Sequence, residues 1–318
     1  MSMSQKYAVI DVGSNTIRLV IFQIEDGSPI AIIGEKVSAR LSDYTKERVL
    51  SQDGIDRACE ALAKFRDLAL CMMDIDKIFV FATASLRGLK NQDEAVAAII
   101  QRTGLVPQVL TGVEEASIGF YGASHFMTDK KKTGIFMDIG GASSEVLLFE
   151  KGKIKHAESL NIGSLNMYSR FVAGILPTES ELLAMTAAIS KEFDRITWLE
   201  EEDIPMIVGI GGTIRGFRQL ALSYYKLPRN TKKFATADLD EMLTRLKAGE
   251  SKMFKRVCKH IPRRALTITP GLMILDEAIR RSGAKKITIS NYGLREGYLM
   301  KRVNRREKRL EKAQEAKA

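Results

Sequence analysis

Two carboxylates flank a run of very small side chains in the segment GIFMDIGGASSEVLLF, residues 134–149. The apolar residues on either side predict two buried strands, with Gly140 to Ser144 as the turn between them. Because glycine allows tight curvature and close approach, the N–H groups of such a turn suit a phosphate. Asp138 and Glu145 would repel that phosphate unless a cation lay between them, and Mg²⁺ bridges carboxylates to phosphates. The segment therefore predicts a phosphate and metal site, with an ordinary glycine-rich hairpin as the alternative.

The same arrangement occurs earlier in the chain, in YAVIDVGSNTIRLVIF at residues 7–22. The two segments superpose without a gap, and their corresponding residues are Asp11 and Asp138, Gly13 and Gly140, Thr16 and Ser143, and Phe22 and Phe149. A chance turn would not produce this repeat, so we expect two similar domains that face one cleft.

A third glycine-rich loop follows an apolar run in MIVGIGGTIRGF, residues 206–217. It leads into a predicted helix, whose N-terminal N–H groups could also face an anion. The three loops supply the candidate phosphate-binding residues, which are Gly13, Ser14, Asn15, Gly140, Gly141, Ala142, Ser143, Gly212 and Thr213. The candidate metal ligands are Asp138, Glu145 and the equivalent Asp11.

Alternating strands and helices must position these loops. Apolar spacing predicts a helix over residues 50–70 and strands at 77–85, 206–210 and 285–293. Capping and stop residues add helices from Asn91 to Gly104, with Glu94 in a capping box, and over 178–189. This alternation predicts an α/β fold with mainly buried sheets. From the repeat we expect domains at residues 1–125 and 126–303 and a basic tail at 304–318.

A predicted helix that opens at Thr111 carries two adjacent glutamates in the sequence TGVEE. The T-x-x-E pattern is a capping box, in which Glu114 reaches back to the backbone at the helix start. Successive helical residues point about 100° apart. Glu115 is therefore either a candidate general base or a solvent-facing residue favoured by the helix dipole. Arg87, directly after a buried strand, is likewise either a phosphate-neutralising cation or an ordinary surface residue.

The composition fits a folded protein of two ordinary domains, with 318 residues of which 45% are hydrophobic and 28% charged. No apolar run reaches the roughly 20 residues of a membrane span, and no signal-peptide pattern opens the chain. We therefore expect a cytoplasmic protein without a membrane partner. Three cysteines and three histidines are scattered along the chain, which argues against a disulfide framework or a zinc site.

The net charge of +10 is unevenly distributed, because residues 301–318 hold eight Lys or Arg against three Glu. We expect this tail to be a solvated helix end or a frayed segment. The rest of the excess is spread over the body of the chain, which is compatible with an anionic substrate. We expect no nucleic-acid partner, and the sequence leaves a homodimer open.

Together these motifs resemble the exopolyphosphatase and guanosine pentaphosphate phosphatase family, within the superfamily of actin, sugar kinases and heat-shock chaperones. The resemblance extends to about residue 303 and rests on VIDVGSNTIRLVI, ATASLR, LTGVEEA, FMDIGGASSEV, VGIGGTI, TPGLMILDEAI and NYGLREGYL. It implies two ribonuclease-H-like domains around a cleft. It also implies removal of the terminal phosphate from polyphosphate or guanosine pentaphosphate, with Mg²⁺ or another divalent cation.

The resemblance also implies roles for individual residues. By motif, Glu115 corresponds to the family's catalytic glutamate and Arg87 to its phosphate-binding arginine. Asp138 and Glu145 correspond to its acidic metal and water site. The sequence departs from the family where Ala142 replaces a usual third glycine and where LSDYTKERVL replaces a Leu-Gly-Glu-Gly pattern. The large C-terminal domain of the long members has no counterpart here, so we expect a short form that favours short polyphosphate chains.

Other functions stay open at this point. One is a guanosine pentaphosphate 5′-phosphohydrolase. A kinase of the same superfamily would need an ATP site and an acceptor pocket. A non-catalytic sensor would bind guanosine tetraphosphate or pentaphosphate without turnover, and the presence of Glu115 argues against it.

Overall fold

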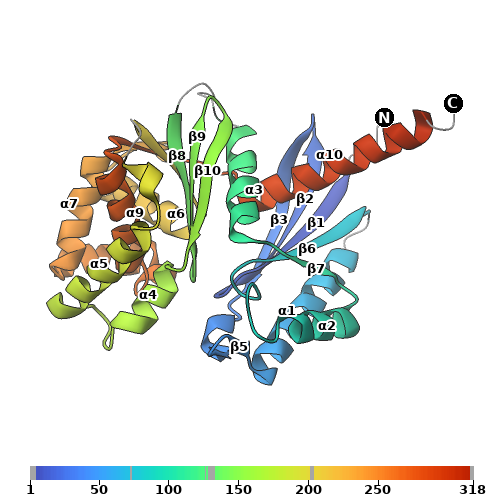
Figure 1. Ribbon diagram of the computed structural model, residues 1–318, viewed down its shortest axis with the longest axis horizontal. Helices are drawn as coiled ribbons and strands as arrows, with labels where there is room; N and C mark the ends of the chain where they lie inside the picture. The colour runs from blue at the N-terminus through green and yellow to red at the C-terminus, as the bar shows by residue number, and fades with distance from the viewer. Residues whose placement is uncertain (1–4, 72–73, 126, 128–132, 201–203, 316–318) are drawn as a thin grey trace. The chain divides into compact units, whose positions relative to one another are not determined.

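The computed structural model describes residues 5–71, 74–125, 127, 133–200 and 204–315, and the backbone alone for 305–315 (Figure 1). The chain divides into two compact units. Unit 1 comprises Met1–Gly122 and Leu294–Ala318, and unit 2 comprises Ala123–Gly293. The first boundary lies close to the predicted one, but residues 294–303 were expected in the second domain and belong to unit 1.

Unit 1 is built on one sheet in the order β3-β2-β1-β6-β7. Its strands are β1 (Lys6–Val12), β2 (Ile17–Glu25), β3 (Ser28–Val37), β6 (Lys77–Ala82) and β7 (Pro107–Val109). The first three strands pair antiparallel, whereas β6 and β7 continue the sheet in parallel with β1. The shorter elements η1 (Leu41–Tyr44), β4 (Thr45–Lys46) and β5 (Val49–Leu50) follow β3.

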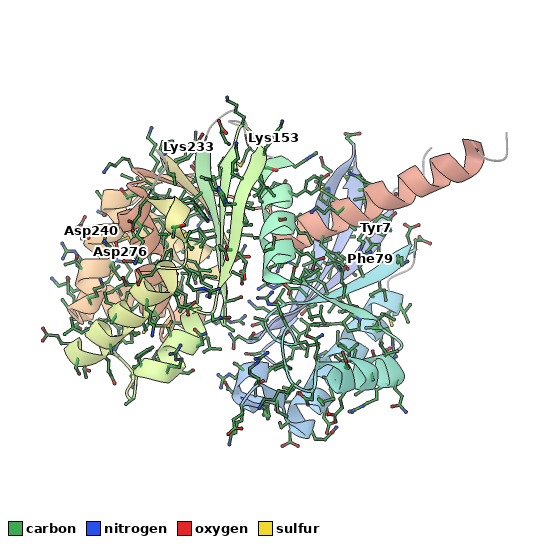
Figure 2. The ribbon with its side chains drawn as sticks, viewed as in Figure 1. Tyr7, Phe79, Lys153, Lys233, Asp240 and Asp276 are labelled. Atoms are coloured by element: carbon green, nitrogen blue, oxygen red, sulfur yellow. The ribbon has the colours of Figure 1, made fainter. Side chains whose placement is uncertain are left out.

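Helices cover both faces of this sheet. Alternate residues of β1 point to opposite faces, and the apolar residues on each face are buried under helices. Ala8, Ile10 and Val12 share a core with apolar residues of α1 (Gln52–Cys71) and α2 (Gln92–Thr103). On the other face, Tyr7 and Val9 share a core with α3 (Gly112–His125) and α10 (Leu294–Glu315). Tyr7 also stacks on Phe79 of β6, with ring centroids 5.9 Å apart (Figure 2).

The packing of α10 explains why the domain prediction was wrong at its C-terminal end. Four apolar residues at helical spacing are buried against the unit 1 sheet, namely Leu294, Tyr298, Leu299 and Val303. At Gly297 the helix crosses α3 so closely that a Cβ would lie 2.0 Å from the Ile118 carbonyl oxygen. The repeat located the two hairpins correctly but carried no information about where the last helix returns.

Unit 2 repeats the same sheet plan, in the order β10-β9-β8-β11-β13-β12. Its strands are β8 (Thr133–Ile139), β9 (Ser144–Glu150), β10 (Lys153–Leu160), β11 (Met206–Ile210), β12 (Lys233–Ala235) and β13 (Lys286–Ile289). Again three strands pair antiparallel, and β11 and β13 continue in parallel. The predicted duplication and the α/β, ribonuclease-H-like class are confirmed. The third strand of each half, β3 and β10, was not predicted.

Helices pack over one face of the unit 2 sheet, where Ile135, Met137 and Ile139 of β8 enter a common core (Figure 1). The helices of this core are α4 (Ser164–Phe171), α5 (Glu179–Phe193), α6 (Gly211–Tyr224), α7 (Thr236–Lys247), α8 (Ser251–His260) and α9 (Ile268–Ser282). Two short 3₁₀ helices accompany them: η2 (Thr197–Leu199) lies between α5 and β11, and η3 (Pro262–Arg264) lies between α8 and α9. Among the described residues, no helix is both long and apolar enough to cross a membrane.

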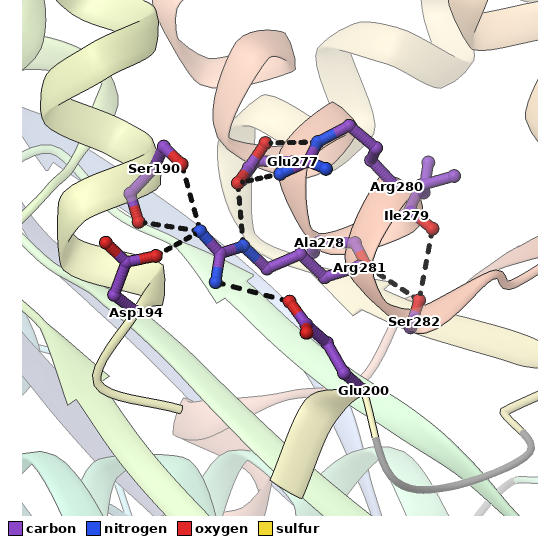
Figure 3. A network of polar contacts seen from close by, with 9 residues as sticks. All are labelled: Ser190, Asp194, Glu200, Glu277, Ala278, Ile279, Arg280, Arg281 and Ser282. Carbon is purple, nitrogen blue, oxygen red and sulfur yellow. Dashed lines mark hydrogen bonds and ion pairs between the residues drawn. The ribbon is translucent and has the colours of Figure 1, made fainter. Parts of the chain in front are cut away.

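A buried arginine ties two of these helices together (Figure 3). Arg281, at the end of α9, donates from Nη2 to the Ser190 carbonyl of α5 at 2.9 Å. Its Nε donates to Glu277 Oε1 at 2.7 Å, and Nη2 pairs with Asp194 at 2.5 Å. Only 9% of the Arg281 side chain is exposed. The network therefore joins the C-terminal ends of α5 and α9 inside unit 2.

Helix ends follow the predicted signals with one exception. Thr178 caps α5 with Glu181 in a capping box, and Gly104 ends α2 in the left-handed conformation at φ 70°. Asn91 precedes α2 as expected, but its side chain makes no cap hydrogen bond. Instead it pairs with both the N–H and the carbonyl of Leu50, at 3.0 and 2.9 Å, so the Asn91 capping box was wrong.

Residues 304–315 of the predicted basic tail form the end of a helix, which is one of the two expected forms. Helix α10 starts at Leu294 and continues without interruption to Glu315. Val303 is the last residue of the helix in the unit 1 core. Residues 316–318 of the predicted tail lie outside the described residues.

Candidate active site

The two repeated loops close with the same hydrogen bond. In the first loop, residues 13–16, the Gly13 N–H donates to the Thr16 carbonyl at 3.2 Å. In the second loop, residues 140–143, the Gly140 N–H donates to the Ser143 carbonyl at 2.9 Å. A Cβ on either glycine would lie 2.9–3.0 Å from that carbonyl oxygen, so both positions require glycine for a close backbone approach. The repeat seen in the sequence is thus a repeat of loop geometry.

Neighbouring segments occupy the carbonyl groups of both loops. At the first loop, Arg40 and Ser42 donate backbone N–H groups to the carbonyls of Asn15 and Ser14, at 3.0 and 3.1 Å. At the second loop, the start of α4 does the same. The N–H groups of Ser164, Leu165 and Asn166 donate to the carbonyls of Gly140 and Gly141 at 2.9 Å.

This arrangement leaves backbone donors in both loops. Within the described residues, the N–H groups of Ser14, Asn15, Gly141 and Ala142 donate to no protein acceptor. Concave groups of backbone N–H are anion-binding structures. Gly13 and Gly140 were predicted as donors, but their N–H groups close the loops and are already engaged.

Two carboxylates lie beneath the second loop. Asp138 and Glu145 are directly opposite each other in the β8–β9 pair, which places both side chains on one face of the sheet. Glu145 is 1% exposed, and its Oε1 accepts hydrogen bonds from Ser143 Oγ at 2.9 Å and Ser159 Oγ at 3.0 Å.

This carboxylate pair fits a magnesium ion of the kind that keeps several waters. The described residues contain no cluster of three or more His, Cys, Asp or Glu side chains suited to a metal. Mg²⁺ commonly uses only one or two carboxylates, with the remaining ligands supplied by water and substrate phosphate. The donor set at Asp138 and Glu145 therefore matches Mg²⁺ better than a metal that needs a full protein cage.

The third loop, residues 211–213, begins α6 beside the same carboxylates. Gly211 has φ +82°, and a Cβ there would lie 2.1 Å from Asp138 Oδ1. A Cβ on Gly212 would lie 1.5 Å from Nη2 of Arg264, so this guanidinium covers the start of the helix. Thr213 is fully buried and donates from Oγ1 to the Ile139 carbonyl at 3.3 Å. Gly212 therefore lies at a cationic helix start, whereas the Thr213 hydroxyl is used within the protein.

Asp11 has different surroundings from its repeat partner Asp138. Arg295 of α10 pairs with it, with Nη1 2.9 Å from Asp11 Oδ2. Across the β1–β2 pair it faces Arg18 rather than a glutamate. Burial raises the pKa of Asp11 above its ordinary value, and the charges of Arg295 and Arg18 offset this rise only in part, while Glu296 adds to it.

The two candidate catalytic residues of unit 1 lie in direct contact. Arg87 Nη1 is 2.6 Å from Glu115 Oε2 and 3.2 Å from the Leu110 carbonyl. Glu115 is 8% exposed, so the alternative of a solvent-facing residue is wrong. Glu114 makes the predicted capping box, because its Oε2 accepts from the Thr111 N–H at 2.8 Å and its own N–H donates to Thr111 Oγ1.

Sequence reasoning missed two arginines at these sites. Arg264 and Arg295 are far along the chain from the groups they touch, at Gly212 and Asp11. Arg295 lies in NYGLREGYL, one of the motifs that carried the family resemblance, but that motif does not identify its partner. For Arg295 the available indication was its position between Gly293 and Gly297, and the sequence around Arg264 gave no comparable indication.

Comparison with known proteins shows a family match over most of the chain. The sequence model of the Ppx/GppA phosphatase family matches residues 20–306. A Vibrio cholerae protein named guanosine-5′-triphosphate,3′-diphosphate pyrophosphatase is 26% identical over 311 residues, which cover 94% of this chain. The chain spans 60% of the length of that relative.

Solved structures of similar proteins cover nearly the whole chain. A Ppx/GppA enzyme from Aquifex aeolicus is 26% identical, with a TM-score of 0.74 over 93% of this chain and 99% of that one. An exopolyphosphatase from Cytophaga hutchinsonii has a TM-score of 0.84 over 94% of this chain and 98% of that one. Its identity is 21%, so this likeness concerns the fold alone.

Proposed function

Because the chain belongs to the Ppx/GppA phosphatase family, we propose that it is an exopolyphosphatase that hydrolyses the terminal phosphate of inorganic polyphosphate. The observation that carries the proposal is the pair of loops with open N–H groups, one of which lies over two facing carboxylates. Such loops bind phosphate oxygens through backbone donors, without selecting a particular side group of the ligand.

Unit 2 supplies the phosphate and metal groups in this proposal. The N–H groups of Gly141 and Ala142 bind phosphate oxygens, and Asp138 and Glu145 hold Mg²⁺ or another divalent cation. When bound, the cation neutralises charge on the phosphates and orients them. Arg264, over the start of α6, adds a fixed positive charge on the same unit.

Unit 1 supplies the proton acceptor. Glu115 takes the proton from the attacking water, and a positioned carboxylate is the usual group for this task. Arg87 fixes the Glu115 carboxylate through its 2.6 Å contact and offsets charge on the transferred phosphoryl group. Positioning and electrostatic stabilisation dominate phosphoryl transfer, so these fixed groups are the kind of catalyst that the reaction needs.

We further propose a preference for short chains. The loops offer two open N–H groups each, which is enough for a few terminal phosphates. Tight binding of a long polymer needs cations spread along its length, and the affinity of such binding falls strongly as the salt concentration rises.

Guanosine pentaphosphate is the second candidate substrate. The Vibrio cholerae relative named for guanosine-5′-triphosphate,3′-diphosphate favours it, at 26% identity. In both reactions a terminal phosphoanhydride is hydrolysed, so the same Glu115 and carboxylate pair would serve. A non-catalytic sensor of these nucleotides is the third candidate and predicts binding without turnover.

Phosphate release from a panel of substrates distinguishes these functions. The panel comprises tripolyphosphate, long polyphosphate, guanosine pentaphosphate and ATP, each with Mg²⁺ and without an added acceptor. Release that is fastest from tripolyphosphate supports the proposal. Release from guanosine pentaphosphate alone would replace polyphosphate as the substrate, and ligand binding without release would support the sensor.

A further inference from the structure

The two repeated hairpins differ at one cross-strand pair that decides their charge. In unit 2, Asp138 faces Glu145, so two carboxylates lie side by side. At the corresponding positions in unit 1, Asp11 faces Arg18. The first hairpin therefore lacks the second carboxylate that would make it a cation site, and it carries an arginine in that place.

A second arginine completes the difference. Arg295 Nη1 lies 2.9 Å from Asp11 Oδ2, and each of the two side chains is only 18% exposed. Arg295 is in the first turn of α10, directly after the chain passes from unit 2 back into unit 1 at Gly293 and Leu294. Close packing of Gly297 on Ile118 of α3 fixes this end of the helix.

The charge at Asp11 matters because of the loop that follows it. Asp11 is two residues before Gly13, and the open N–H groups of Ser14 and Asn15 come next. A carboxylate without a compensating cation at this position would oppose the binding of a phosphate to the loop, because like charges in a partly buried site repel strongly.

We propose that Arg295 is a positioning residue that neutralises Asp11 and so keeps the first loop receptive to phosphate. The inference rests on the proposed function, because it assigns the loop to a phosphate-bearing substrate. The two hairpins then obtain positive charge from different sources. The second hairpin binds a metal ion from solution, whereas Arg295 and Arg18 supply the positive charge at the first hairpin. Asp11, predicted from the repeat as a metal ligand, is left out of the metal site.

The test is a charge-compensation cycle measured on tripolyphosphate. Arg295→Gln removes the cation in direct contact with Asp11 and leaves only Arg18 to offset its charge. KM should rise roughly tenfold or more, with a smaller change in kcat, because truncating one partner of a buried charge pair leaves the other under-compensated. Adding Asp11→Asn to Arg295→Gln removes the stranded carboxylate and returns KM to within about threefold of the wild type. Asp11→Asn alone should not raise KM, because it leaves the positive charges of Arg295 and Arg18 beside the loop.

Arg302→Gln is the matched control, because it removes the same charge from the same helix. Arg302 contacts the Tyr298 hydroxyl at 2.9 Å and Gln108, and it makes no contact with Asp11. KM for tripolyphosphate should change less than threefold in this variant. Circular dichroism melting of every variant shows whether a loss of activity follows a loss of folding.

Two outcomes would overturn the inference: an equal rise in KM for Arg302→Gln, or no recovery when Asp11→Asn is added. Calorimetric binding of tripolyphosphate to the same variants tests the role of Arg295 separately from the proposed exopolyphosphatase activity. If the wild type binds tripolyphosphate but releases no phosphate, exopolyphosphatase activity is wrong, and the cycle in binding affinity still decides the role of Arg295.

Discussion

Arg87 Nη1 lies 2.6 Å from Glu115 Oε2 and 3.2 Å from the Leu110 carbonyl oxygen. One guanidinium therefore links the end of β7 to the first turn of α3, where Glu115 is located. Because Glu115 is largely buried, its carboxylate has few rotamers available once this contact forms. The contact fixes the direction in which the proposed base faces.

Glu115→Gln should lower kcat by roughly 10²-fold or more, the usual contribution of a positioned general base. The KM should change little, because glutamine keeps the size and the hydrogen-bonding oxygen of the side chain. Steady-state phosphate release measures both constants. Glu114→Gln is the neighbouring control, and it should retain activity, because a glutamine oxygen can accept from the Thr111 N–H in the same capping box. Equal losses of kcat in the two variants would contradict the assignment of Glu115 as the general base.

Arg87→Lys should lower kcat roughly tenfold to a hundredfold, because lysine lacks the planar donors that reach Glu115 and the Leu110 carbonyl together. The measurement is kcat for tripolyphosphate at saturating Mg²⁺. Arg48→Lys provides the comparison, since Arg48 donates to the Gly88 carbonyl at 2.8 Å and does not contact Glu115. Full activity in Arg87→Lys would contradict a role in holding the base.

Asp138→Asn and Glu145→Gln should each raise the Mg²⁺ concentration for half-maximal activity, by roughly ten- to a hundredfold. Each change removes one anionic oxygen from the pair across β8 and β9. The activation curve for Mg²⁺ at fixed tripolyphosphate reports this directly. Asp11→Asn should leave the curve in place, because Arg295 already neutralises Asp11. Unchanged curves in both unit 2 variants would show that these acids do not act through the metal.

Local sequence pattern predicted the loops and helix caps that are formed by residues close together in the chain. The repeated spacing correctly located two loops, one at Asp138, Gly140 and Ser143 and one at Asp11, Gly13 and Thr16. Each loop is closed by an equivalent backbone hydrogen bond. The capping role of Glu114 also followed from spacing alone, because a capping box involves only residues three apart.

Contacts between distant segments could not be predicted in the same way. The Asp11 pair with Arg295 joins positions 284 residues apart, and no periodicity connects them. For the same reason the repeat assigned Asp11 the same role as Asp138. Asn91 shows the complementary case, since Leu50 uses the amide that local pattern assigned to a helix cap.

Arg281→Met should destabilise unit 2 by about 3 kcal/mol, because it removes one partner from a buried charge network and leaves Glu277 and Asp194 less compensated. Urea unfolding at neutral pH measures this. Arg195→Met is the surface control: its pair with Glu192 is half exposed, with 50% of the Arg195 side chain accessible. That change should cost less than about 1 kcal/mol. Similar losses of unfolding free energy in both variants would show that the network in Figure 3 stabilises the protein no more than a surface ion pair does.

The stability that this network contributes should also depend on pH. Burial raises the pKa of Glu277, but the hydrogen bonds and charges of Arg280 and Arg281 outweigh it, so its pKa lies below the ordinary value. A lowered pKa in the folded state stabilises the protein above the unfolded pKa, and this contribution is lost as pH falls through the folded pKa. The difference in unfolding free energy between wild type and Arg281→Met should therefore shrink below about pH 4. A constant difference from pH 7 to pH 3 would contradict the assignment.

Deleting residues 305–318 should leave the release of phosphate from tripolyphosphate unchanged and alter release from long polyphosphate little. The cut keeps Val303, the last residue of α10 in the unit 1 core, and Asn304, whose Nδ2 donates to the Tyr121 hydroxyl at 3.2 Å. Folding should therefore survive, as melting by circular dichroism would show. The removed segment is basic, and a basic segment that held a long polymer would do so through counterion release, with affinity that falls steeply as salt rises. A large loss on long polyphosphate alone, strongest at low salt, would identify the end of α10 as a tether for the polymer and overturn the proposed preference for short chains.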